Sequence, residues 1–167
     1  MRINSDQMVQ IKQIRADWIA QYCKMAGYLG ISCLTCGTTG IALITACRKE
    51  GLECRVFSNP RRWWGNADFI EYNGSQFFDA TSGHIPLFMI CKLGILYRAY
   101  LGDTQAETIT VPTGSGETAI SLRIAYPDKI IVAQYGESAE IKREGDAVLN
   151  AAVDALCVCR LSDVGYA

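Results

Sequence analysis

The segment that follows Cys36 constrains the fold most, because it predicts a helix and then a strand in direct succession. An apolar run over residues 37–49 follows a loop rich in Gly, Ser and Thr, and Gly51 stands where a helix C-terminal cap would lie. Residues 54–57 are typical of a strand. Cys36 comes at the helix N-terminus, where the helix dipole favours a nucleophilic thiolate. Cys36 is therefore a candidate nucleophile, and a buried cysteine that only packs is the alternative.

The spacing of residues around Cys36 resembles that of the transglutaminase-like cysteine enzymes. In that superfamily, small residues follow the nucleophile by four and six positions, and an arginine enters the next strand. A second block over residues 67–81 resembles the family's His-x-aromatic-x-Glu and Asp-x-Thr motifs. The resemblance covers residues 36–81, about a quarter of the chain. The matching residues of the first block are Gly40, Ala42, Cys47, Arg48, Gly51 and Arg55.

This resemblance implies an α+β fold, with the nucleophile helix packed on an antiparallel sheet in a single domain over residues 1–167. It also implies a cysteine hydrolase or acyltransferase that attacks an amide bond and forms a thioester, as a protease, isopeptidase, deamidase or transglutaminase does. The site residues would be Cys36, position 67 and Asp79, the last of which orients the family's catalytic histidine. This chain has Ala67 at that position, and alanine can neither deprotonate the thiol nor protonate the leaving amine.

Three explanations of Ala67 stay open: a natural pseudoenzyme, an engineered replacement of histidine, or a different base. His84 is the chain's single histidine and could serve as that base, with a later carboxylate such as Asp103. A histidine that only caps a loop is the alternative. A non-catalytic binding module on the same fold is therefore the second hypothesis for the function.

Composition limits the partners that we expect. Half of the 167 residues are apolar, a fifth are charged and the formal net charge is −1, as in a globular protein without a drive toward nucleic acid or an anionic membrane. No apolar run is long enough to span a bilayer, and residues 1–7 lack the apolar core of a signal peptide. We therefore expect a cytoplasmic protein, and the resemblance to the transglutaminase-like enzymes implies a protein or peptide substrate. The aromatic and basic segment 60–64 is interpreted as a packed loop or as a recognition loop.

The chain has eight cysteines, and a disulfide framework is the weaker interpretation because cytosolic thiols are kept reduced. Cys47 and Cys54 are expected to be small hydrophobic core residues. Two other hypotheses are a redox pair within residues 33–36 and a four-thiolate zinc site. The residues of that zinc site would be Cys33, Cys36, Cys157 and Cys159. Because the second pair of this set lacks the usual spacing, we expect no metal and no cofactor.

Periodicity predicts the remaining elements. A first helix begins with Ser5 or Asp6 as its cap and ends near Gly27, and its buried face is expected to comprise Met8, Ile11, Ile14, Trp18, Tyr22 and Met25. Residues 27–35 are expected to be a loop, and residues 85–100 are helix or buried strand. Strands are expected over residues 67–72, 76–80, 107–111, 119–125 and 129–134, with hairpins joining the first two and the last two. Asp146 would cap a final helix that ends near Cys159.

Overall fold

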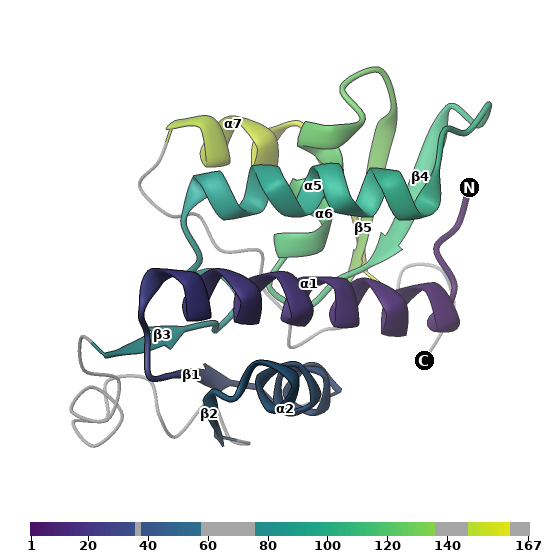
Figure 1. Ribbon diagram of the computed structural model, residues 1–167. Coiled ribbons are helices and arrows are strands. Elements are labelled where there is room, and N and C mark those ends of the chain that lie inside the picture. Colours follow the sequence, from purple (N-terminus) through teal and green to yellow (C-terminus); the bar gives the residue numbers. More distant parts are fainter. Residues whose placement is uncertain (36–37, 58–75, 136–146, 161–167) are drawn as a thin grey trace. The chain divides into compact units, whose positions relative to one another are not determined.

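The computed structural model describes residues 1–35, 38–57, 76–135 and 147–160 (Figure 1). The chain divides into two compact units. One comprises Val9–His84 and is called the β1 unit; the other comprises Met1–Met8 with Ile85–Ala167 and is called the β4 unit. Each unit contains one three-stranded sheet, and every strand pair in both sheets is parallel.

The sheet of the β1 unit has the order β2-β1-β3. Its strands are β1 (Gly30–Leu34), β2 (Glu53–Phe57) and β3 (Phe77–Asp79). Parallel neighbours require a crossover connection, and α2 (Thr39–Glu50) supplies it between β1 and β2. This helix ends at Gly51, whose φ of 69° places it in the left-handed region that glycine adopts without strain. The predicted helix and strand after Cys36 are thus confirmed.

The helix α1 (Ser5–Ala26) begins with a reciprocal cap that the sequence prediction misplaced by one residue. The Asn4 side-chain oxygen accepts the backbone N–H of Gln7 at 2.8 Å, and Gln7 Oε1 accepts the N–H of Asn4 at 2.9 Å. The predicted apolar face was confirmed at Ile11, which is buried, and was wrong at Met25, which is exposed. The residues of α1 that are buried are Ile11, Arg15, Ala16, Ile19, Ala20 and Cys23.

The sheet of the β4 unit has the order β4-β5-β6. Its strands are β4 (Thr108–Pro112), β5 (Ile130–Tyr135) and β6 (Cys157–Arg160), and its helices are α5 (Leu87–Leu101), α6 (Glu117–Ala125) and α7 (Ala147–Asp154). The N-terminal segment runs beside β4, since Ile3 donates to the Thr110 carbonyl at 2.9 Å and Arg2 forms a parallel bridge with the same residue. The helix α5 packs on α6 (Figure 1).

The predicted α+β fold with an antiparallel sheet was wrong, and the segment 119–125 shows why. Its alternating Ile120, Leu122 and Ile124 imitate a strand, yet these residues belong to α6. This helix contacts α5, α7 and the sheet, so apolar residues point in several directions and no longer mark a single face. Residues 119–125 are helical and β5 pairs instead with β4 in parallel, so the predicted hairpin between residues 119–125 and 129–134 is excluded.

Two further predictions were wrong for the same non-local reason. Residues 27–35 contain β1 rather than a loop, because the segment is enclosed by β2 and β3 and all five residues of the strand are buried. The final helix ends at Asp154, and the following residues form β6 by pairing with β5. The predicted strand at 67–72 and its turn lie outside the described residues. Its expected partner, β3, pairs with β1 in parallel.

In the part of the chain that the structure describes, no helix combines the length and apolar character needed to cross a membrane.

The prediction of a single domain over residues 1–167 stays a proposal, and α1 gives it a physical basis. The helix belongs to the β4 unit up to Met8 and to the β1 unit from Val9 onward, so unfolding either unit disturbs an element of both. We therefore expect a single calorimetric transition whose calorimetric and van't Hoff enthalpies agree. Two resolved transitions would contradict this expectation.

Candidate functional site

Of the three residues expected to form a catalytic site, the structure describes only Asp79. Cys36 and Ala67 lie outside the described residues. Asp79 ends β3, and its Oδ1 accepts the backbone N–H of Thr81 at 2.9 Å. The Thr81 hydroxyl accepts the N–H of Leu34, the last residue of β1, at 2.9 Å. Asp79 and Thr81 therefore stabilise the chain at the carboxyl ends of β3 and β1.

The alternative base, His84, belongs to the β1 unit, and the carboxylate of Asp103 belongs to the β4 unit. His84 is exposed, and its backbone N–H donates to the Thr81 carbonyl at 3.0 Å. Asp103 accepts two hydrogen bonds from the Arg98 guanidinium, at 2.9 and 3.2 Å. Asp103 therefore already has a cationic partner on its own unit.

Arg15 lies at the edge of the β1 unit, and sequence reasoning missed it. This arginine is buried on α1, and its Nη2 donates to the carbonyl of Ala80 at 2.5 Å. Nearby on the same helix, Lys12 donates to the Thr38 hydroxyl at 2.8 Å, directly before α2. Two cationic side chains of α1 therefore lie at the carboxyl edge of this sheet.

The β4 unit presents a glycine-bearing turn at the carboxyl edge of its own sheet. Residues 113–116, called here the 113–116 turn, connect β4 directly to the N-terminus of α6. The hydroxyl of Thr113 accepts the N–H of Gly116 at 3.1 Å, and the N–H of Thr113 donates to the Gln134 carbonyl at 2.7 Å. Gly116 has a φ of 92°, which the reversal into the helix requires.

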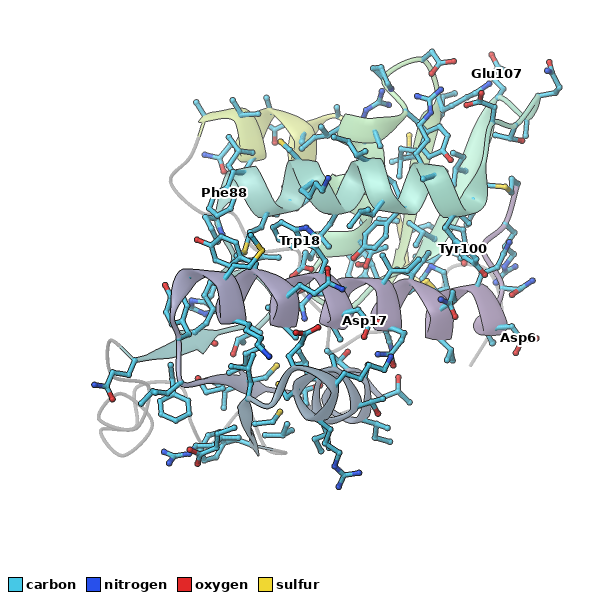
Figure 2. The ribbon with its side chains drawn as sticks, in the orientation of Figure 1. Asp6, Asp17, Trp18, Phe88, Tyr100 and Glu107 are labelled. Carbon is cyan, nitrogen blue, oxygen red and sulfur yellow. The ribbon has the colours of Figure 1, made fainter. Side chains whose placement is uncertain are left out.

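The neighbouring strand adds polar groups to this edge. Gln134 is buried near the end of β5, and its side-chain oxygen accepts a hydrogen bond from Arg2 at 3.2 Å. In the part of the chain that the structure describes, Gly114 lies beside open space, since no heavy atom there comes within 4 Å of a Cβ built at this glycine. Glu107 precedes β4 and marks the opposite, amino edge of the sheet in Figure 2. The carboxyl edge therefore combines open backbone, a buried amide, the cation of Arg2 and the buried carboxylate of Glu117 at the start of α6.

The structure supports no metal centre at the described residues, where no group of three or more His, Cys, Asp or Glu side chains could hold an ion. The hypothetical zinc set includes Cys36, which lies outside that part of the chain.

No family model and no curated protein matches this chain. Among solved structures, the chain is similar to the crystal structure of a threonine deaminase from T.th., with a TM-score of 0.50 and 16% sequence identity. The similarity covers 76% of this chain but 45% of that protein, so the chain spans less than half of its length. At this identity, the similarity shows the fold alone.

This similarity overturns the assignment to the transglutaminase-like cysteine enzymes. Two parallel three-stranded sheets and the likeness to threonine deaminase indicate a Rossmann-type α/β fold. The predicted function as a cysteine hydrolase or acyltransferase was therefore wrong, as were the classes of cysteine protease and transglutaminase. The short motif around Cys36 misled because a loop, a helix and a strand in succession also describe a parallel crossover.

Sequence reasoning also missed the 113–116 turn. The signal was present, because a strand is followed by Thr113, two glycines and the acidic Glu117 at the start of an apolar segment. Such a glycine-bearing turn between a strand and a helix is typical of anion-binding sites. The signal was lost when residues 119–125 were interpreted as a strand, since the turn then joined two strands instead of a strand and a helix.

Proposed function

We propose that the chain binds a small molecule through an oxyanion, either a phosphate or a carboxylate group, at the carboxyl edge of the β4-unit sheet. The observation that carries this proposal is the 113–116 turn between β4 and α6. In open parallel sheets, ligands bind outside the carboxyl ends of the strands. The first-turn N–H groups of a helix have no intrahelical partner and attract negative charge.

The local geometry fits a close approach of ligand to backbone. The hydrogen bonds of Thr113 to Gly116 and to Gln134 hold the turn in place. The backbone of Gly114 is open on the side of its missing Cβ, where no atom of the described residues comes within 4 Å. Arg2, hydrogen-bonded to Gln134 on the same sheet, adds a positive charge that favours an anion.

The likeness to threonine deaminase supports a small molecule over a macromolecule, since that protein's name refers to an amino acid. An amino acid carries a carboxylate, and a phosphate-bearing cofactor carries an equivalent oxyanion. The ligand would replace the protein or peptide substrate expected from the sequence. A cytoplasmic location, with no nucleic-acid or membrane partner, stays part of the proposal.

A charge placed at Gly114 tests the proposal. We expect Gly114→Asp to weaken binding of the oxyanion about tenfold, since a like charge within a few ångströms costs roughly 1–4 kcal/mol. The side chain should fit, because a Cβ at this position meets no neighbouring atom. Isothermal titration of the full chain with inorganic phosphate, threonine and pyridoxal phosphate as separate probes measures the effect.

The matched control is Gly114→Asn, which has nearly the same shape as the aspartate variant but no charge. It should bind the preferred probe within about twofold of the parent chain, a difference of roughly 0.4 kcal/mol. Equal weakening by both variants would indicate a steric effect and contradict an oxyanion site. Absence of binding by all three probes would refute the proposed function.

A further inference from the structure

Two cysteines of the β1 unit meet across the turn that joins α2 to β2. Cys47 lies in the last turn of α2, and its carbonyl accepts the N–H of Leu52 at 2.9 Å. Gly51 reverses the chain between Cys47 and Cys54, so that Cys54, the second residue of β2, returns beside the end of the helix. The side chains of Cys47 and Cys54 lie close enough together that each thiol is the main influence on the pKa of the other.

The sheet register explains why the Cys54 side chain faces the helix. Side chains two residues apart on a strand share a face, so Cys54 and Val56 point to the same side. That side carries α2, since a Cβ added at Gly40 of the helix would lie 2.8 Å from Val56 Cγ1. The two thiols therefore meet because of the backbone path rather than through one side-chain rotamer.

The two thiols differ in accessibility and in proton affinity. Cys47 is 1% exposed, whereas Cys54 is half-buried. The neighbouring Cys47 thiol lowers the pKa of Cys54, and the same interaction, together with burial, raises the pKa of Cys47. Cys54 is thus the thiol with more thiolate character and better access to a reagent, which is the combination that governs thiol reactivity.

We propose that Cys47 and Cys54 form a redox-active dithiol that low-molecular-weight disulfides oxidise to an intramolecular disulfide, with Cys54 as the attacking sulfur. The Cys54 thiolate attacks one sulfur of the reagent disulfide, forming a mixed disulfide and releasing one thiolate, which takes a proton from water. Cys47 then loses its proton to water and attacks Cys54 Sγ, which releases the second thiolate.

The electrons and protons balance over these two reaction steps. The two protein thiols lose two electrons and two protons, and the reagent disulfide gains them as two thiols. A thiol reductant reverses the reaction by the same route. The product would link the last turn of α2 covalently to β2. Cys47 is a buried core residue, as the sequence predicted, and Cys54 is half-buried; together they would also be a modification site.

Peptide mapping of the full chain tests the proposal. The chain is treated with glutathione disulfide and the reaction is quenched with acid. The remaining thiols are then blocked with an alkylating reagent, and the chain is digested with trypsin. The fragment 50–55 contains Cys54 as its single cysteine, while Cys47 ends up in fragment 25–48. We expect these two fragments to be joined, and to separate after reduction.

Two variants and one control identify which sulfur atoms form the disulfide. Cys47→Ala should abolish the joined fragments and leave glutathione attached to Cys54, because the resolving thiol is absent. Cys54→Ala should leave Cys47 unmodified. The matched control Cys23→Ala removes a buried cysteine of the same unit, whose pKa burial raises to about 12, and should leave the joined fragments unchanged. Circular dichroism of each variant checks that it is folded.

Exposed Cys157 reports in the same sample that the reagent has reached accessible thiols. Modified Cys157 together with unmodified Cys54 would overturn the proposal. So would a glutathione adduct on Cys54 of the parent chain without joined fragments, or joined fragments that persist in the Cys47→Ala variant, because Cys33 or Cys36 would then be the partner.

Discussion

Leu43→Ala is expected to lower the free energy of unfolding by about 2–5 kcal/mol. Leu43 is 0% exposed and is one of the residues through which α2 packs in the β1 unit. Truncation removes buried apolar surface and leaves a cavity that the surrounding side chains fill only in part. Urea denaturation followed by circular dichroism measures the change as a lower transition midpoint.

The control for this variant lies on the same helix. Ile41 is 67% exposed, so Ile41→Ala should change the free energy of unfolding by no more than about 0.5 kcal/mol. A loss of the same size at both positions would mean that burial does not set the cost of truncation on α2, because alanine is the best helix former and helix propensity cannot explain a loss. A loss below about 1 kcal/mol for Leu43→Ala would contradict the packing described for α2.

Gly94→Val should destabilise the β4 unit by roughly 3 kcal/mol, since overpacking costs about 1–3 kcal/mol and occasionally more. Gly94 lies on α5 where that helix meets α6, and a Cβ there would come within 2.5 Å of the Ser121 carbonyl oxygen. That oxygen belongs to the backbone of α6, so the two helices must separate to admit the side chain. The midpoint of urea denaturation is again the measurement.

Ala99→Val provides the control, because it places the same side chain at an exposed position of α5. Its cost should be the difference in helix propensity alone, about 0.5 kcal/mol. If both valine variants lose the same small amount, α5 and α6 do not approach each other at Gly94 as closely as the structure indicates.

Local patterns were sufficient to locate several elements. The apolar residues near the start of the chain and the N-terminal polar cluster predicted α1, whose observed cap, Asn4, lies one residue before the predicted one. The run that ends at Gly51 predicted α2, because a left-handed residue stops a helix wherever the rest of the chain lies. Strands near residues 54–57, 107–111 and 129–134 were also located, from short β-rich segments between turns.

Other elements depended on residues far away in the sequence. The segment 119–125 is a helix although its alternation suggests a strand, because parallel β4 and β5 require a crossover. The segment 157–160 is a strand because β5 is available as its partner. In both cases, local preference was weak and the tertiary partner determined the result.

The candidate sites follow the same division. The sequence by itself determined which chemical groups are present, namely the glycines and Thr113 of the 113–116 turn and the thiols of Cys47 and Cys54. Only the tertiary structure placed the turn at the carboxyl edge of a parallel sheet and brought the two thiols close enough for each to influence the pKa of the other. The physical reason is that strand direction and pairing are set by contacts between distant segments, whereas residue spacing reports only on neighbours along the chain.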